Sequence, residues 1–125
     1  MKIKIPGALL AALSLSLTPA CYVYDDSRRP GDVTFAWSFY GASCYEDRRI
    51  EQVHISIPGE PLDNRGYYPC SANGYDGITL HDFAPGTYDF DIDAIDYSGA
   101  YSYYARGSFT VNGSITVRVD LSPNY

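Results

Sequence analysis

Large apolar residues alternate with small or polar ones along much of the chain after residue 32. In the segment 33–40, the apolar positions are Val33, Phe35, Trp37 and Phe39. A period of two is the pattern of a strand with one buried face. The same period recurs in Val53–Ile57, Ile78–Leu80, Thr87–Tyr97 and Ile115–Leu121. Turn residues such as Pro58-Gly59 and Pro85-Gly86 bound these runs, so the pattern predicts strands joined by short turns.

The segment after Ser98-Gly99 is predicted to fold back on Thr87–Tyr97 as a hairpin. A loop with an even number of residues places Tyr88 opposite Phe109, Phe90 opposite Gly107, Ile92 opposite Ala105 and Asp91 opposite Arg106. A loop with an odd number would place Ile92 opposite Arg106. The hydrophobic pattern therefore favours the even loop, because a shift by one residue moves every side chain to the other face.

A second turn, at Asn112-Gly113, precedes the last strand. This dipeptide is typical of a two-residue hairpin loop. A two-residue loop would set Phe109 opposite Thr116, whereas a three-residue loop sets it opposite Val117 and keeps both apolar. We therefore expect an odd loop or a β-bulge here.

About seven short strands, with no segment of helical periodicity beyond the N-terminal region, predict an all-β fold. We expect an antiparallel β-sandwich, immunoglobulin-like or prealbumin-like, over residues 33–125. Trp37 precedes both Cys44 and Cys70. In antibody-type domains the tryptophan lies between the two cysteines, so a true immunoglobulin domain is disfavoured.

The first twenty residues have the three-part pattern of a secretory signal peptide. Lys2 and Lys4 precede an apolar run from Ile5 to Leu17, and Thr18-Pro19-Ala20 follows. The apolar run is too short to span a membrane, which takes about 20 residues. We expect residues 1–20 to be a signal peptide and residues 21–32, which are mostly polar, to be a tether.

Cys21 directly follows Ala20, with Leu17 close upstream. This arrangement resembles the lipobox of bacterial lipoproteins, in which the first mature residue is a cysteine that carries lipid on its sulfur. It departs from the usual pattern, because Thr18 stands where an apolar residue is expected. Ordinary cleavage after Ala20 is the alternative, and it would leave Cys21 as an exposed thiol. Lipidation at Cys21 is the preferred interpretation, because it accounts for an odd cysteine.

The remaining two cysteines, Cys44 and Cys70, are expected to form a disulfide, as is usual in an oxidising compartment. In the chain-entropy model such a bridge stabilises a small domain by about 3 to 4 kcal/mol. Zinc binding is the rival interpretation. It is disfavoured because the two cysteines lack the close paired spacing of a zinc site, and only His54 and His81 could assist them.

Net charge and the shortage of bases limit the chemistry. Nine basic against fifteen acidic residues give a net charge of −6, which disfavours binding to nucleic acid. Loss of the signal peptide would remove Lys2 and Lys4 and leave no lysine. His54 is expected to point to solvent and His81 lies beside Asp82. No nucleophile motif accompanies either histidine, so we expect no enzymatic activity and no cofactor.

Three carboxylates alternate along one strand, at Asp89, Asp91 and Asp93. Carboxylates are calcium ligands, and a metal site at these three residues is the weaker interpretation. Same-face residues on a strand are nearly 7 Å apart, too wide for one ion to collect all three. A solvated face, with Arg106 relieving the charge, is therefore preferred.

Tyrosine is unusually frequent, with 13 in the chain. Tyr97, Tyr101, Tyr103 and Tyr104 crowd one end of the predicted hairpin. A tyrosine offers a flat apolar ring and a hydroxyl at low entropic cost, which suits recognition of sugars or proteins. These four residues are a candidate binding patch. The alternative is that they close the end of the core.

The segment Phe83-Ala84-Pro85-Gly86-Thr87-Tyr88, with Asp96-Tyr97-Ser98-Gly99 after the strand, resembles a recurring piece of immunoglobulin-like and prealbumin-like domains, including those of carboxypeptidase regulatory regions. Together with the lipobox-like start, the chain resembles a small bacterial lipoprotein that carries one such domain. The resemblance implies a non-catalytic module of the cell envelope, lipid-anchored to the outer membrane, with a structural or protein-interaction role. A glycan-binding module using Tyr97–Tyr104 is the alternative. The expected partners are the membrane and an envelope protein or glycan.

Overall fold

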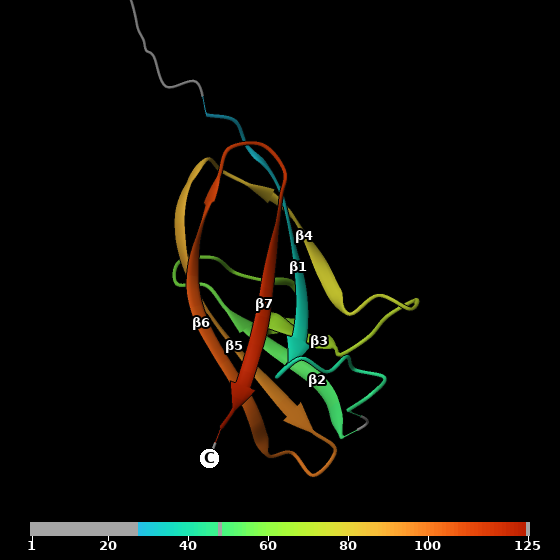
Figure 1. Ribbon diagram of the computed structural model, residues 1–125. Helices are drawn as coiled ribbons and strands as arrows, with labels where there is room; N and C mark the ends of the chain where they lie inside the picture. The colour runs from blue at the N-terminus through green and yellow to red at the C-terminus, as the bar shows by residue number, and fades with distance from the viewer. Residues whose placement is uncertain (1–27, 48, 125) are drawn as a thin grey trace, which may run out of the picture.

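Seven strands and short connections make up the part of the chain that the computed structural model describes, residues 28–47 and 49–124 (Figure 1). The all-β prediction and the number of strands are confirmed. The strands are β1 (Gly31–Phe39), β2 (Ile50–Ser56), β3 (Tyr67–Pro69), β4 (Gly77–Phe83), β5 (Gly86–Asp96), β6 (Tyr101–Val111) and β7 (Ile115–Pro123). A short 3-10 turn, η1 (Asp63–Gly66), precedes β3.

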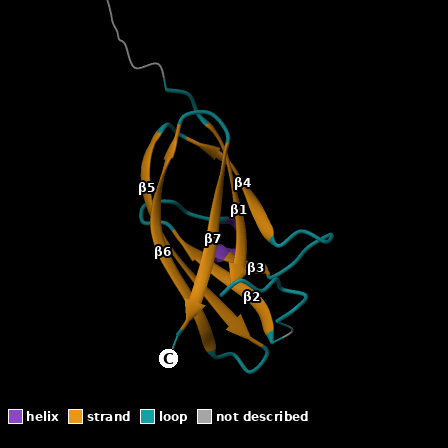
Figure 2. Ribbon diagram, in the orientation of Figure 1, coloured by secondary structure: helices purple, strands orange, loops and turns teal. Residues whose placement is uncertain are grey.

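The strands form one mixed sheet in the order β3-β2-β5-β6-β7-β1-β4, curled nearly into a barrel (Figure 2). Long ladders join β2, β5 and β6 on one side and β7, β1 and β4 on the other. The link between these two groups is short, because β6 and β7 pair only where Tyr103 faces Pro123 and Tyr104 faces Ser122. The curl thus encloses one apolar interior.

The β5–β6 hairpin has the register that the hydrophobic pattern predicts. Tyr88 lies opposite Phe109, Phe90 opposite Gly107, Ile92 opposite Ala105, and Asp91 opposite Arg106. Phe90, Ile92 and Phe109 are buried while Arg106 is exposed, so the separation of apolar and charged faces fixes the pairing. Near the turn the register shifts between Ala94 and Ile95, where β6 contains one extra residue.

The prediction that all strands are antiparallel is wrong, because β1 and β7 run parallel. Their register extends from Val33 opposite Ile115 to Phe39 opposite Leu121. Two hydrogen bonds hold the starts of the two strands together: the N–H of Gly113 donates to the Arg29 carbonyl at 2.8 Å, and the N–H of Asp32 donates to the side-chain Oγ of Ser114 at 3.0 Å. With both strands starting at one point, they lie side by side in the same direction.

The connection between β6 and β7 has three residues, 112–114, as the expected odd loop requires. The two strands nevertheless separate after this loop. β6 continues its ladder with β5, and β7 pairs with β1 over its first seven residues. They meet again only at the far end, where Tyr103 opposes Pro123. The loop length was thus foreseeable, whereas the divergence of the strands depends on β1.

The interior is filled by aromatic and β-branched side chains from both halves of the sheet. The ring of Phe35, on β1, lies edge-on to Phe90 and Phe109 with centroid distances of 5.3 and 5.7 Å. These two phenylalanines come from β5 and β6, which are not neighbours of β1 in the sheet. Phe35, Ile55, Ile92 and Leu121 are almost fully buried. The core therefore joins strands that share no backbone hydrogen bonds.

The strand that begins the described fold starts earlier than predicted. β1 begins at Gly31, so Gly31 and Asp32, assigned above to the tether, belong to the sheet. An added Cβ on Gly31 would lie 2.3 Å from the carbonyl carbon of Gly113, so only glycine allows this close approach. The proposed signal peptide and Cys21 lie outside the described residues. Among the residues described, no helix is long and apolar enough to cross a membrane.

Candidate functional site: a tyrosine-bearing loop end and an aromatic sheet face

Three loops follow β1, β3 and β5, and together they line one hollow of the surface. We call this surface the loop end; its loops are residues 40–49, 70–76 and 97–100. Each loop exposes tyrosine: Tyr40 and Tyr45 are 75% exposed, Tyr97 is 69% exposed and Tyr75 is 47% exposed. Large aromatic rings left in solvent on adjoining loops are a feature of recognition surfaces.

A disulfide joins the first two loops, as predicted. Cys44 and Cys70 are bonded with a Cα–Cα distance of 6.0 Å. The backbone N–H of Cys44 also donates to the Asp76 carboxylate at 2.9 Å, and the indole N–H of Trp37 donates to the Cys70 carbonyl at 2.8 Å. Loops 40–49 and 70–76 are therefore fixed to each other and to the core.

The exposed Tyr75 stands on a tight turn. Ala72 and Tyr75 exchange backbone hydrogen bonds of 3.0 and 2.9 Å, and Asn73 and Gly74 between them both have positive φ, 54° and 78°. Two positive φ values are the signature of a type I′ turn, for which Asn-Gly is the preferred sequence. The turn is thus locally determined, and it holds the ring of Tyr75 at the surface.

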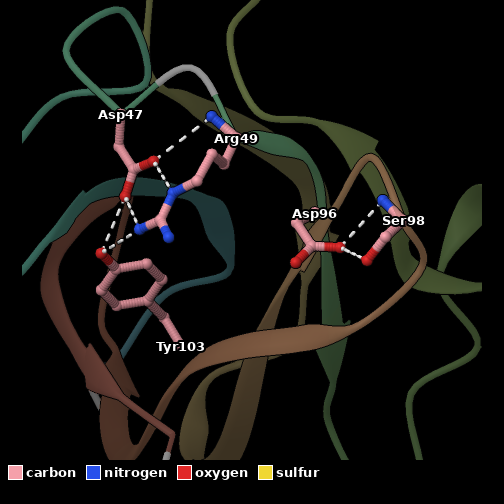
Figure 3. Close-up of polar contacts among 5 residues, drawn as sticks. All are labelled: Asp47, Arg49, Asp96, Ser98 and Tyr103. Carbon is pink, nitrogen blue, oxygen red and sulfur yellow. Dashed lines mark hydrogen bonds and ion pairs between the residues drawn. The ribbon is translucent and has the colours of Figure 1, made fainter.

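Polar contacts fix the loop 40–49 to β6 and order the loop 97–100 (Figure 3). Tyr103 donates its hydroxyl to Asp47 at 2.7 Å, and Arg49 Nε donates to the same carboxylate at 3.2 Å. The hydrogen bond from Arg49 lowers the pKa of Asp47 below its ordinary value, and Asp47 in turn raises the pKa of Tyr103. In the other loop, Asp96 accepts hydrogen bonds from the backbone and side chain of Ser98.

A shallow hollow of about 420 Å³ lies where the three loops meet. Its lining comes from all three loops and from the start of β2: Cys44, Tyr45, Ile50, Glu51, Cys70, Ser71 and Tyr97. The N–H of Tyr97 donates to the Arg49 carbonyl at 3.1 Å, which connects the third loop to the first. The loop end is therefore a continuous surface with a disulfide at its base.

The four tyrosines of the candidate patch do not share one surface. Tyr97 and Tyr101 are exposed, but Tyr103 is buried and its ring packs against Phe39 at a centroid distance of 5.5 Å. Tyr104 is half-buried on the outer face of the sheet. The extra residue in β6, Ser102, lies where the register shifts, so Tyr101 no longer follows the alternation that places Tyr103 in the core.

A second group of side chains lies on the outer face of β3, β2, β5 and β6. The register places Tyr67 opposite His54, His54 opposite Asp93, and Asp93 opposite Tyr104. We call this group, with Tyr101, the outer-face row. The rings of Tyr67 and His54 are stacked at 4.2 Å. The side chain of Tyr67 is the main reason that the pKa of Tyr101 lies above its ordinary value.

Next to this row, one carboxylate oxygen of Asp91, Oδ1, accepts two hydrogen bonds. Arg106 Nε donates to its carboxylate at 3.0 Å, and the Tyr104 hydroxyl donates to the same oxygen at 2.9 Å. The Arg106 guanidinium also lies over the Tyr104 ring, 5.7 Å from its centroid. The hydrogen bond from Arg106 is the main reason that the pKa of Asp91 lies below its ordinary value. The expected relief of this face by Arg106 is confirmed.

No group of three or more metal-ligating side chains occurs within the described residues. Asp89, Asp91 and Asp93 share one face as predicted, but Asp91 is taken up by Arg106 and Tyr104. The two cysteines are bonded to each other. The residues considered for calcium or zinc are therefore not assembled around a common point.

The two histidines lie on different parts of the surface. His54 is half-buried, with Nε2 3.1 Å from the Arg65 carbonyl. His81 is exposed and its Nδ1 lies 3.2 Å from Asp32. His81 also lines a shallow hollow together with Glu60, Asp63 and Asp82, and the lining residues described there contain neither serine nor cysteine. Neither histidine has a hydroxyl or thiol nucleophile as a hydrogen-bond partner in the described structure.

The sequence pattern does not indicate that the loops of the loop end are ordered by Asp47, Arg49 and Asp76. They lie in loops without periodicity, and their partners are distant in sequence, Tyr103 for Asp47 and Cys44 for Asp76. No protein-family model matches this chain, and no curated protein shows significant similarity to it. The loop end and the outer face are therefore the features that bear on function.

Proposed function

We propose that this chain is a non-catalytic binding module of the bacterial cell envelope, exported by residues 1–20 and anchored by lipid on Cys21. In this proposal residues 33–125 form a β-sandwich of immunoglobulin-like or prealbumin-like type. The packing of Phe35 against Phe90 and Phe109, from strands that do not pair with β1, supports two packed layers. The Cys44–Cys70 disulfide supports an oxidising compartment.

The loop end carries the proposal that the module recognises another protein. Tyr40, Tyr45, Tyr75 and Tyr97 are exposed on three adjoining loops, and these loops are otherwise rich in serine, glycine and alanine. Tyrosine rings supply contact area, and small polar residues supply hydrogen bonds. Because the disulfide and the Asp47–Tyr103 bond already order the loops, little conformational entropy would be lost on binding.

Substitution of loop tyrosines tests this role. The purified domain with Tyr45 and Tyr75 both changed to serine should lose capture of its envelope partner, identified by cross-linking in the native membrane and confirmed with the purified partner. The matched control changes Tyr101 to serine, on the sheet face, and should retain capture. Equal capture by the loop variant and the wild-type protein would contradict the proposal.

A glycan-binding role is the second candidate, and the exposed Tyr101 beside half-buried Tyr67 and Tyr104 supports it. Aromatic rings flanked by carboxylates suit sugar rings, which present C–H groups and hydroxyls. Binding to purified peptidoglycan fragments that is lost on changing Tyr101 and Tyr104 to alanine, and retained in the Tyr45/Tyr75 variant, would favour this role.

Lipid modification of Cys21 is tested by a separate experiment. Intact mass spectrometry of the mature protein from membranes should show a chain that begins at Cys21 and carries acyl groups. A chain that begins at Cys21 with a free thiol would leave the module secreted and unanchored. This measurement does not depend on what the loop end binds.

A further inference from the structure

Asp93 stands out on the outer-face row because its carboxylate has no donor. It is half-buried, and it accepts no hydrogen bond and forms no ion pair with the residues described in the structure, 28–47 and 49–124. Burial raises the pKa of Asp93 above its ordinary value. An incompletely solvated carboxylate without a donor is unfavourable for the fold. Such a group is a candidate for contact with a ligand.

The surroundings of Asp93 are aromatic and apolar. His54 and Tyr104 lie directly opposite it on the two neighbouring strands, and Tyr67 stacks on His54. Tyr101 stands on β6 opposite Ile95, two residues along β5 from Asp93. Ile95 is only 5% exposed although the alternation places it on this outer face, opposite Gln52 and Tyr101. Aromatic rings therefore stand on both sides of Asp93 along the outer-face row.

Two residues earlier on β5, and on the same face, Asp91 has the hydrogen-bond donors that Asp93 lacks. At Asp91 the carboxylate meets a tyrosine hydroxyl and an arginine, and the guanidinium lies over the ring of that tyrosine, Tyr104. At Asp93 the carboxylate and the tyrosines are present, but no arginine stands directly opposite on either neighbouring strand, where the residues are His54 and Tyr104. A guanidinium forms planar hydrogen bonds to carboxylates and stacks on aromatic rings.

We propose that the surface around Asp93, Tyr67 and Tyr101 binds an arginine side chain of a partner polypeptide. The guanidinium would donate to the free carboxylate and lie against the tyrosine rings, as Arg106 does at Asp91. The net charge of −6 favours a basic partner sequence. This site lies on the sheet face and is separate from the loop end, so it stands or falls independently of the proposed function.

Several titratable side chains face Asp93 and its neighbours, and their protonation must stay constant while binding is measured. They are His54 on β2, Tyr67 on β3, Asp91 on β5, and Tyr101, Tyr104 and Arg106 on β6. All peptides and variants are therefore compared in one buffer at one pH, so that differences in binding come from the arginine and from the substituted residue.

The test uses a short capped peptide with one arginine and the same peptide with citrulline, which has the same shape without the charge. Binding to the purified full domain is followed by backbone amide NMR. The arginine peptide should shift the resonances of Asp93 and Tyr101 and leave those of the loop 70–76 in place. A dissociation constant of about 1 mM is expected for a single side chain, and the citrulline peptide should bind at least tenfold more weakly.

Two variants locate the site. Asp93→Asn should weaken the arginine peptide about tenfold or more, because the charged acceptor is lost. Asp89→Asn removes the same charge from the same face of β5, farther from the tyrosines, and should leave affinity within about twofold, as expected for a screened surface charge. Tyr101→Leu should also weaken binding, through loss of the ring. Equal binding of arginine and citrulline, equal effects of the two asparagine variants, or no shift at Asp93 would each overturn the proposal.

Discussion

The indole N–H of Trp37 donates a 2.8 Å hydrogen bond to the backbone carbonyl of Cys70, next to the disulfide. Trp37 is 4% exposed and belongs to β1, whereas Cys70 follows β3. The bond therefore connects the core of the sheet to the base of the loop end. It also satisfies a carbonyl in a buried environment, where an unpaired acceptor is costly.

Replacement of Trp37 by phenylalanine should destabilise the fold by about 1 to 3 kcal/mol, since it leaves the Cys70 carbonyl without its donor and removes ring volume. Urea denaturation followed by far-UV circular dichroism measures the change. A matched control is Tyr88→Phe, which removes a hydrogen bond to the exposed Ala84 carbonyl. If the two variants lost the same stability, the buried carbonyl would not be the cause.

Removal of the disulfide should cost about 3 to 4 kcal/mol, the loss expected for a loop of this length. Replacing Cys44 and Cys70 by alanine and measuring urea unfolding gives the value. Fluorescence of Trp37, which is the sole tryptophan in the sequence, reports on the same region. Reductant should destabilise the wild-type protein by a similar amount and leave the double variant unchanged. Sensitivity of the double variant to reductant would point to a different cause.

Loss of the Tyr103 hydroxyl should loosen the loop 40–49. Tyr103→Phe removes the 2.7 Å hydrogen bond to Asp47, and we expect a loss of about 1 kcal/mol. Hydrogen exchange should become faster at residues 43–47. Tyr104→Phe is the control, because its hydroxyl also donates to an aspartate but lies on the outer face. Faster exchange of the loop in the control variant would refute the assignment.

Gly107→Ala should destabilise the β5–β6 hairpin. An added Cβ would lie 2.9 Å from the ring of Phe90, its cross-strand partner, which is buried and has little room to move. Overpacking of this kind costs about 1 to 3 kcal/mol. Thermal unfolding measures it, with Ser108→Ala as the exposed neighbour expected to change stability by no more than about 0.5 kcal/mol. A stable Gly107→Ala protein would mean that Phe90 is free to shift.

Asp93→Asn should raise stability at neutral pH. Burial raises the pKa of Asp93 in the folded protein above its ordinary value of 3.8, so ionisation of this group disfavours the folded state. The penalty is absent below pH 3.8, develops as pH rises through the raised pKa, and is complete above it. The variant should therefore melt at a higher temperature than the wild-type protein at pH 7.

The same comparison near pH 3 gives the control. There Asp93 is protonated in both folded and unfolded chains, so the advantage of Asp93→Asn should vanish. Asp89→Asn, on the same face but exposed, should show no comparable gain at pH 7. An advantage of the Asp93 variant that persists in acid would have to come from packing and not from charge.

The β5–β6 register could be predicted because burial and charge give the same answer at every position, with Ile92 and Asp91 on opposite faces. The parallel pairing of β1 with β7 could not be predicted from the sequence. It depends on contacts between Arg29 and Gly113, which are far apart in sequence and have no periodic signal. Alternation states which side of a strand is buried, but not which neighbour covers its edge.

The candidate tyrosine patch was recovered only in part for a related reason. One inserted residue, Ser102, changes the alternation in β6, so the nearby Tyr101 and Tyr103 have different environments. A β-bulge of this kind has no reliable sequence marker in a run of serine and tyrosine. Asp93 was visible as one of three alternating carboxylates, but only the arrangement of strands shows that Arg106 reaches Asp91 and not Asp93.

The parallel pairing of β1 and β7 also limits how early the sheet can close. The first strand of the described chain obtains one of its two neighbours from the last strand, and the β1–β7 partners are more than 80 residues apart. Contacts between such distant segments slow folding, because the chain must close a long loop before they form. A growing chain would lack this strand pair until residues 115–121 have emerged from the ribosome. The sheet therefore cannot close before β7 is available to β1.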